Sequence, residues 1–138
     1  MLSEIFSVDL DDGVIRVPRV RMREAAIELQ RLGFERLDMV TAVDRGEHFE
    51  LVYRLESRHL SDEIFVKSDV PREDAHIVSV CDVWPAANWQ EREVYDLFGI
   101  VFEGHPDLRR MFLPEEFEGY PLRRDYDSAR MIRRPDYI

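Results

Sequence analysis

Three carboxylates gather in one short stretch of the chain, at Glu91, Glu93 and Asp96. A pair of carboxylates facing one substrate is the requirement for acid–base catalysis of the kind that glycosidases use. On a helix, however, Glu91 and Glu93 diverge by about 200°, because each residue turns the helix by about 100°. Acidic side chains early in a helix also interact favourably with its dipole. We therefore interpret these carboxylates as helix electrostatics or interface contacts and not as a catalytic pair.

The four histidines and the single cysteine lack the spacing of a metal site. No His-x-x-x-His pair occurs, and no histidine lies at ligand spacing from Cys81. One cysteine also excludes an intrachain disulfide and a multi-cysteine iron–sulfur site. Cys81 is flanked by Val80 and Asp82 in an apolar stretch, which predicts a buried structural thiol. The sequence contains no nucleophile elbow, phosphate loop or dinucleotide-binding glycine motif.

Arginines form adjacent pairs near the end of the chain, at 109–110, 123–124 and 133–134. Paired arginines can bind phosphate or nucleic acid, but acidic residues are interspersed among these pairs. The net charge of −10 also argues against nucleic acid or anionic lipid as the main partner. We therefore expect ion pairs within the chain or across a subunit boundary. Eighteen of the 19 basic residues are arginine, which suits interfacial ion pairs, although genome base composition produces the same bias.

The elements that position these residues belong to one α+β domain of ordinary size, because the chain has 138 residues, 45% of them hydrophobic. No apolar run approaches the ~20 residues of a membrane-spanning helix. Residues 1–12 carry four acids and no basic residue, unlike a secretory signal, and a cytoplasmic setting is the simplest interpretation. We expect a small, mostly antiparallel or mixed sheet with a helix on one face.

Residue periodicity places the first helix and the strands. A three-to-four-residue apolar repeat, stopped by Gly33, predicts a helix over 21–32. The expected strand over 34–43 carries apolar Leu37, Met39 and Val43. Further strands are expected over 13–17, 48–55 and 63–70, with a turn at 44–47 and an extended stretch or strand at 76–83.

A second helix is expected over 86–98, because Pro85 suits a first helical turn and Gly99 a C-terminal stop. Arg92 and Asp96 are spaced as an i,i+4 ion pair on this helix. The residues that follow, 103–138, combine four prolines with aromatic side chains and arginines. Prolines at that density prevent long helices, and disordered tails are poor in aromatics. We therefore expect a domain over 1–102 and an extended docking arm over 103–138.

Two adjoining motifs carry a resemblance to a known family. They are Glu91-Arg-Glu-Val-Tyr-Asp-Leu-Phe-Gly99 and Gly104-His-Pro-Asp-Leu-Arg-Arg110, within a longer match from Trp84 that continues through Pro114 to Glu118-Gly-Tyr-Pro-Leu-Arg-Arg-Asp-Tyr126. This stretch strongly resembles the signature of the thirty-kilodalton subunit family of respiratory complex I, the NADH:quinone oxidoreductases. The family usually has His where Tyr120 stands, and often Lys in place of Arg124.

The resemblance implies a non-catalytic subunit that carries no flavin, iron–sulfur cluster or metal. FMN and iron–sulfur clusters are expected in other subunits of the complex, which passes electrons to quinone and translocates protons. The implied partners are the large subunit that helps form the quinone cavity and the small cluster-bearing subunits. The implied location is peripheral, on the cytoplasmic face of the membrane. Membrane-bound nickel–iron hydrogenases and ferredoxin- or coenzyme-driven relatives contain a similar subunit, so these alternatives stay open.

The family pattern assigns interface or structural roles, and no catalytic, cofactor-binding or metal-ligating role, to this chain. We expect the second helix to bury Trp89, Leu97 and Phe98, and the arm from residue 111 onward to lie on the large subunit. His105 is expected to form a turn hydrogen bond, and Asp107 to cap that turn. The full set of expected interface or structural residues is Trp89, Glu91, Arg92, Glu93, Tyr95, Asp96, Gly99, His105, Pro106, Asp107, Arg109, Arg110, Pro121, Arg123, Arg124, Asp125 and Tyr126.

Two other classes of protein remain as competing hypotheses. A free-standing enzyme using Glu91, Asp96 and His105 would need a concave pocket around these side chains. A generic adaptor domain unrelated to respiration would not need so long a signature.

Overall fold

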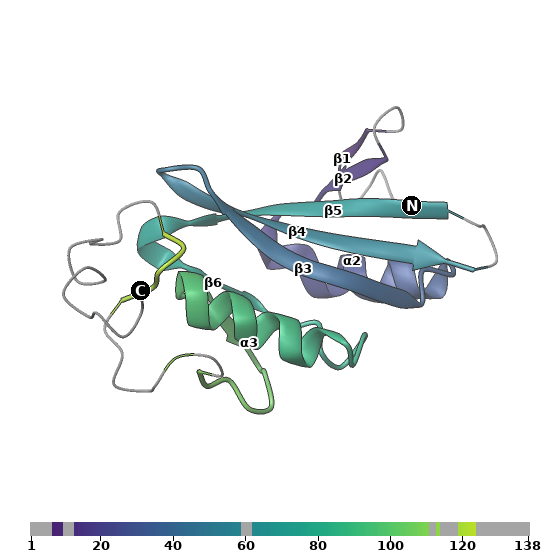
Figure 1. Ribbon diagram of the computed structural model, residues 1–138. Helices are drawn as coiled ribbons and strands as arrows, with labels where there is room; N and C mark the ends of the chain where they lie inside the picture. The colour runs from purple at the N-terminus through teal and green to yellow at the C-terminus, as the bar shows by residue number, and fades with distance from the viewer. Residues whose placement is uncertain (1–6, 10–12, 59–61, 111–112, 114–118, 124–138) are drawn as a thin grey trace.

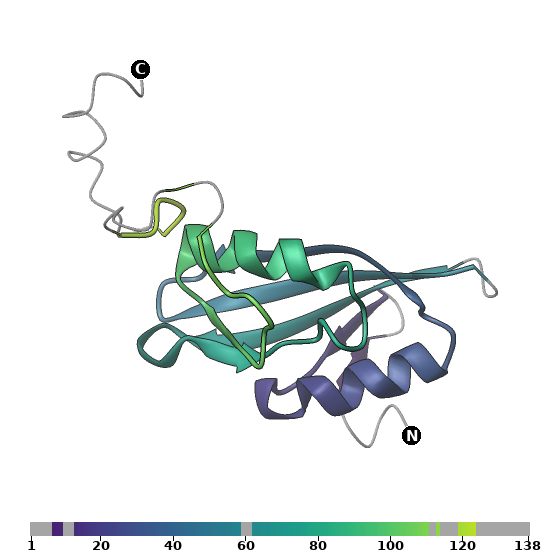
Figure 2. The same cartoon turned by 90° about the horizontal axis from the view of Figure 1, so that it is seen from below.

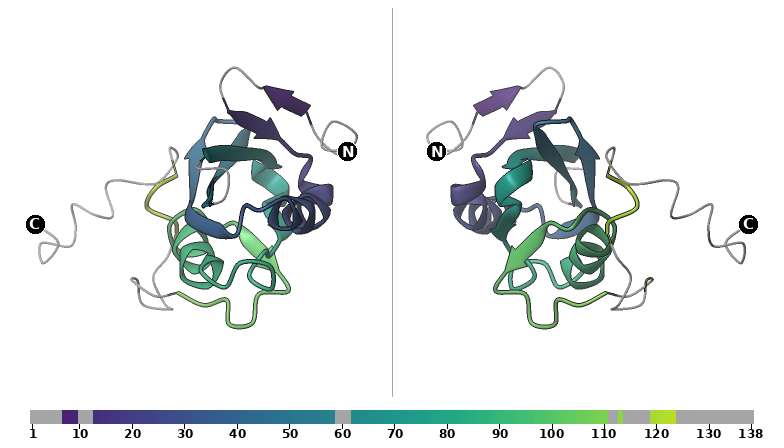
Figure 3. Two further views of the ribbon diagram at one scale, coloured as in Figure 1. Left: turned by 90° about the vertical axis from the view of Figure 1, so that its right-hand side faces the viewer. Right: turned by 90° about the vertical axis from the view of Figure 1, so that its left-hand side faces the viewer.

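A computed structural model of the chain describes residues 7–9, 13–58, 62–110, 113 and 119–123 (Figure 1). A five-stranded sheet has the strand order β1-β2-β5-β4-β3, and helices α2 (Met22–Arg31) and α3 (Ala87–Phe98) lie on the same side of it (Figure 3). The strands of this sheet are β1 (Ser7–Asp9), β2 (Val14–Arg16), β3 (Arg36–Asp44), β4 (His48–Ser57) and β5 (Asp62–Pro71). The α+β class is therefore confirmed.

A second, two-stranded parallel sheet pairs β6 (His76–Val78) with β7 (Val101–Glu103) and lies between the two helices (Figure 3). Two short 3-10 helices, η1 (Arg19–Arg21) and η2 (Arg72–Asp74), precede α2 and β6. In the main sheet β2 and β5 run parallel, while the other pairs are antiparallel. The main sheet is thus mixed and mostly antiparallel, as the sequence predicts.

The core forms between the helices and the inner face of β4 and β5. Phe49, Leu51, Tyr53 and Leu55 alternate along β4, and these residues are at most 1% exposed. Their burial on the inner face confirms the alternation in the sequence, because successive side chains of a strand point to opposite faces. Glu50 and Val52, which lie between them on the other face, are also buried, at 5% and 9% exposed. The open side of the sheet carries charged residues, which Arg54 illustrates through its ion pair with Glu63 (2.6 Å).

The apolar residues expected on the strand over 34–43, Leu37, Met39 and Val43, do not share one face of β3. The pairing of β3 with β4 shifts between Leu37 and Met39, which leaves one extra residue on β3. A bulge of this kind reverses the alternation, because side chains repeat every two residues. Val40 and Ala42 are therefore buried, while Val43 is exposed and Met39 is only half-buried.

Helix α2 buries the expected apolar stripe of Met22, Ala25, Ala26 and Leu29. It begins one residue later than predicted, because Arg19–Arg21 form η1. Leu32, the last residue of the helix predicted over 21–32, caps the C-terminal end and is exposed. Neither helix in the described part of the chain has the length and apolarity needed to cross a bilayer.

The apolar stretch at 76–83 is a strand for three residues only and then turns toward α3. Val80 and Val83, which belong to this turning stretch, are buried. The indole nitrogen of Trp84 donates a hydrogen bond to the Phe34 carbonyl oxygen at 3.0 Å. This contact fixes the start of α3 against the residues that lead into β3.

Candidate functional site

Helix α3 lies along β3, the edge strand of the sheet (Figure 2). The Gln90 side chain accepts a hydrogen bond from the Val40 amide (2.5 Å) and donates one to the Asp38 carbonyl oxygen (3.2 Å). One side-chain amide therefore satisfies two backbone groups of the edge strand, at the β3 bulge. This arrangement covers part of the edge, which would otherwise present unpaired backbone groups to solvent.

Glu91 joins α3 to the turn that follows β6. It is 0% exposed, and its carboxyl group accepts hydrogen bonds from the Ser79 hydroxyl (2.6 Å) and the Val80 amide (2.9 Å). Burial raises the pKa of Glu91 to about 7, even though these two hydrogen bonds favour the ionised form. The carboxyl group thus holds α3 to the turn after β6, and its charge changes near neutral pH.

This raised pKa predicts a pH dependence of folding stability. The folded chain holds a proton on Glu91 that the unfolded chain releases between its ordinary pKa of 4.5 and about 7. Stability therefore falls as the pH rises through this window, by at most about 3 kcal/mol. We expect Glu91→Gln to remove this part of the pH dependence, as measured by urea unfolding at pH 4.5 and 7.5.

The matched control is Glu93→Gln, because Glu93 is exposed on the same helix. This control is expected to keep the pH dependence of the unsubstituted chain. If Glu91→Gln and the unsubstituted chain lost equal stability over the window, the assignment of that loss to Glu91 would be wrong.

Asp96 and Arg110 form an ion pair between the end of α3 and the arm. The Arg110 Nε atom donates to an Asp96 carboxylate oxygen at 2.7 Å, and the side chains of Arg110 and Asp96 are 9% and 0% exposed. Arg110 also donates to the carbonyl oxygens of Asp96 (2.8 Å) and Gly119 (2.7 Å). The second Asp96 oxygen accepts the Leu113 amide at 3.2 Å. The pair therefore joins the end of α3 to Leu113 and to Gly119.

Residues 119–123 return to the C-terminal end of α3. The Leu122 amide donates to the Leu97 carbonyl oxygen (3.1 Å), and Arg123 Nε donates to the Phe98 carbonyl oxygen (2.6 Å). Both donors satisfy carbonyl groups that a helix end leaves without partners, and the arginine also suits the helix dipole. The Tyr120 ring packs against two guanidinium groups, those of Arg110 and Arg123, each 4.9 Å from the ring centre.

Gly99 makes this close approach possible. It has φ = 78°, a left-handed conformation that ends α3 as the sequence predicts. A Cβ atom at residue 99 would lie 2.7 Å from the Tyr120 ring and 2.9 Å from the Arg123 guanidinium. Glycine is therefore required here both for its backbone conformation and for its missing side chain.

The predicted turn hydrogen bond of His105 is confirmed. The Asp107 amide donates to His105 Nδ1 at 2.9 Å, so Nε2 carries the proton and donates to the Asn88 carbonyl oxygen at 3.0 Å. The predicted cap by the Asp107 side chain is wrong. That carboxylate pairs instead with Arg109 at 3.2 Å, and the histidine ring closes the turn.

Two predictions for α3 are also wrong. The buried face of the helix is formed by Ala87, Glu91, Val94 and Phe98, so Trp89 lies on another face and is 65% exposed. Asp96 pairs with Arg110, and not with Arg92 as its spacing predicts, because Arg110 reaches it from the arm. Phe98 is buried as expected, and Leu97 is half-buried.

The remaining expected residues lie at the edge of this site or beyond it. Tyr95 and Pro121 are half-buried, and Pro106 is exposed. Arg124, Asp125 and Tyr126 lie outside the described residues. Cys81 is half-buried, and burial raises the pKa of its thiol. The domain boundary at residue 102 stays a prediction.

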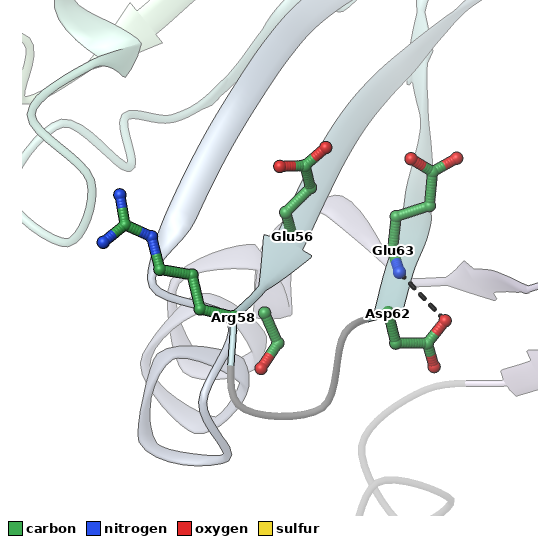
Figure 4. A pocket seen from close by; sticks show the side chains of 5 residues that line it. Glu56, Arg58, Asp62 and Glu63 are labelled. Atoms are coloured by element: carbon green, nitrogen blue, oxygen red, sulfur yellow. Dashed lines mark hydrogen bonds between the residues drawn. The ribbon is translucent and has the colours of Figure 1, made fainter.

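A hollow of about 500 Å³, lined in part by Trp84, Pro85 and Ala86, lies at the start of α3. No metal centre emerges at α3 within the part of the chain that the structure describes. Among these residues, no group of three or more His, Cys, Asp or Glu side chains is placed to hold a metal ion. Another hollow, of about 430 Å³, lies at the far end of β4 and β5 (Figure 4). It is lined by Glu56, Ser57, Arg58, Asp62 and Glu63, which do not belong to the expected site.

The sequence of the chain matches a known family. Residues 15–131 fit the family model described as respiratory-chain NADH dehydrogenase, 30 Kd subunit. The chain belongs to this family. The resemblance drawn from the two motifs is therefore confirmed.

Curated relatives in this family are similar over most of the chain. NADH-quinone oxidoreductase subunit 5 of Thermus thermophilus is 42% identical over 137 residues, which covers 88% of this chain and 66% of the relative. An NADH-quinone oxidoreductase subunit of Acidothermus cellulolyticus is 40% identical over 126 residues, which covers 86% of this chain and 66% of the relative. The chain thus spans slightly less than two thirds of the length of these relatives.

Two solved structures share the fold. The trypsin-resistant fragment (1–134) of Nqo5 is 36% identical, with a TM-score of 0.67 over 77% of this chain and 92% of that chain. A chain of the membrane-bound sulfane sulfur reductase, an archaeal respiratory membrane complex, is 30% identical. Its TM-score is 0.79 over 91% of this chain and 77% of that chain.

Sequence patterns miss two residues that shape the site, Gln90 and Ser79. Both act through contacts that join distant segments, Gln90 to β3 and Ser79 to Glu91. A motif reports residues close together in sequence, so neither contact has a local signal. The β3 bulge that Gln90 covers is itself absent from the alternation pattern.

Proposed function

We propose that the chain is a non-catalytic structural subunit of the peripheral arm of a proton-translocating NADH (or ferredoxin):quinone oxidoreductase. In this proposal it docks on the large quinone-site subunit. Membership of the family and relatives named as subunits of NADH-quinone oxidoreductase support this assignment. The sulfane sulfur reductase neighbour, whose title describes a respiratory membrane complex, supports it as well.

One observation supports the structural role: the residues of the family motifs contact other residues of the same chain. Glu91 holds the turn after β6, and the Asp96–Arg110 pair holds the arm at the end of α3. Arg123 extends this contact to the last carbonyl group of the helix. Side chains engaged in this way shape a docking surface, whereas a substrate site would need polar groups free to meet a ligand.

The proposal also assigns the cofactors and the location. FMN and iron–sulfur clusters belong to other subunits, and the small cluster-bearing subunits are neighbours of this chain. The chain lies peripherally on the cytoplasmic face of the membrane and contacts no nucleic acid, in keeping with its net charge of −10.

A second candidate is the equivalent subunit of a membrane-bound relative of complex I, such as a nickel–iron hydrogenase. The sulfane sulfur reductase chain favours it, because that chain overlaps 91% of this chain at a TM-score of 0.79. The large subunit distinguishes the two candidates, because hydrogenase large subunits carry paired Cys-x-x-Cys metal ligands.

Purification of the tagged chain from host membranes in mild detergent, followed by mass spectrometry, tests both candidates. We expect recovery of a large subunit without the Cys-x-x-Cys pairs, together with cluster-bearing and membrane subunits. A large subunit with these pairs would support the second candidate. Recovery of the chain alone from the soluble fraction would contradict both.

A further inference from the structure

Arg92 is nearly buried, and no carboxylate of the described residues pairs with it. The residue is 9% exposed, and its guanidinium lies 4.9 Å from the centre of the Trp89 ring. Its hydrogen bond, from Nε to the Arg109 carbonyl oxygen, is long at 3.5 Å. In the described part of the chain, neither terminal nitrogen of Arg92 donates to another group.

The neighbouring arginines differ from Arg92, because each of them pairs with a carboxylate. Arg109 pairs with Asp107 at 3.2 Å, and Arg110 pairs with Asp96 at 2.7 Å. A charged group removed from water is unfavourable unless it is paired, and an aromatic ring compensates only part of that cost. Arg92 is therefore a nearly buried cation of α3 whose terminal nitrogens have no partner among the described residues. Its terminal nitrogens are not sealed inside the described part of the chain, so an anion can reach them from outside.

The exposed Trp89 side chain indicates the side from which an anion would approach Arg92. The indole is 65% exposed and covers the Arg92 guanidinium, and Glu93 is exposed one turn along the helix. Tryptophan and arginine are enriched among the few residues that carry most of the binding energy of protein interfaces. We call Trp89, Arg92 and Glu93 the α3 patch.

We propose that the α3 patch lies at an interface in which an Asp or Glu side chain of a neighbouring subunit pairs with Arg92 beneath a covered Trp89. The inference rests on the proposed function, because it needs a partner subunit. Charge complementarity selects the occupant, since an unpaired guanidinium fits a carboxylate and Trp89 supplies apolar contact area around it. A second copy of this chain and a free small anion are the other occupants that the test distinguishes.

The first experiment compares Arg92→Met with Arg31→Met. Arg31 is an exposed arginine on α2 that pairs with Glu28, so it provides a matched loss of charge on the other helix. Arg92→Met leaves the partner carboxylate unpaired, so we expect at least about tenfold less chain in the purified complex. The thermal unfolding midpoint of the full chain alone is expected to stay within about 2 °C, because Arg92 loses no ion pair with the described residues.

Unchanged assembly of Arg92→Met would overturn the inference. So would equal loss of assembly with Arg31→Met. A fall in the unfolding midpoint of the chain alone that matches the loss of assembly would also overturn it, because Arg92 would then act in folding.

The second experiment identifies the occupant. Arg92→Lys keeps the positive charge and introduces an amine that a carbodiimide couples to a carboxylate in contact with it. Background coupling from this chain is low, because Lys67 is its single lysine. We expect mass spectrometry of the treated complex to find residue 92 linked to an Asp or Glu of another subunit. Arg109→Lys is the positive control, since it faces Asp107.

The outcomes separate the inference from the function on which it rests. If the complex assembles and residue 109 couples while residue 92 does not, the inference fails and the proposed function stands. The inference also fails if residue 92 couples to a second copy of this chain, or if free phosphate or acetate blocks coupling without any linked subunit. If no complex is recovered with the unsubstituted chain, the proposed function itself fails.

Discussion

Asp96→Asn is expected to lower the free energy of unfolding by about 3–5 kcal/mol, because it breaks a buried ion pair and leaves the Arg110 charge uncompensated. The Asp96 side chain is 0% exposed, and that of Arg110 is 9% exposed. The same carboxylate also accepts the Leu113 amide, so the substitution loosens the arm where it leaves α3. Urea unfolding followed by circular dichroism measures the change.

Asp107→Asn is the matched control, because Asp107 is half-exposed in its pair with Arg109. Exposed pairs contribute about 1 kcal/mol or less. Equal losses of unfolding free energy for Asp96→Asn and Asp107→Asn would contradict the larger stabilisation that we assign to the buried pair. An Arg110→Met variant should lose a similar amount to Asp96→Asn, and the double variant less than the sum of the two.

Gly99→Ala is expected to cost about 2–5 kcal/mol, from two separate causes. An L-residue in the left-handed conformation costs about 1–2 kcal/mol. The new Cβ atom would also lie 2.7 Å from the Tyr120 ring, and overpacking of this kind costs about 1–3 kcal/mol. We expect urea unfolding to report the loss, and NMR shifts of the Tyr120 ring to show that residues 119–123 move away from α3.

Gly104→Ala separates the two causes. Gly104 has φ = 82°, close to that of Gly99, but no described atom lies within 4 Å of a Cβ built there. This variant is therefore expected to show the backbone cost alone, about 1–2 kcal/mol. If both alanine variants lost the same stability, the packing of Tyr120 and Arg123 on Gly99 would not contribute.

Local patterns predict the parts of the fold that follow one periodicity. The alternation from Phe49 to Leu55 identifies β4 and its buried face, and Gly99 marks the end of α3. Where a tertiary contact changes the geometry, these patterns fail. The bulge between Leu37 and Met39 reverses the buried face of β3, and nothing in the local sequence marks it.

In the candidate site, too, local patterns predict some features and miss those that depend on tertiary contacts. The motifs identify Glu91, Asp96 and Arg110 as important, but they do not identify their partners. A helical wheel offers Arg92 as the partner of Asp96, whereas the arm brings Arg110 to that carboxylate instead. The hydrophobicity of Trp89 predicts a buried side chain, yet α3 buries another stripe and leaves the indole exposed.

Turnover per assembled complex tests the structural assignment most directly. The complex is purified with Arg110→Ala in this chain, its composition is measured by mass spectrometry, and its donor:quinone turnover is divided by the amount of complete complex. We predict less complete complex, because the Asp96 carboxylate loses its partner, with unchanged turnover in each complex that forms. A full complement of subunits together with lost turnover would contradict a purely structural role for this chain.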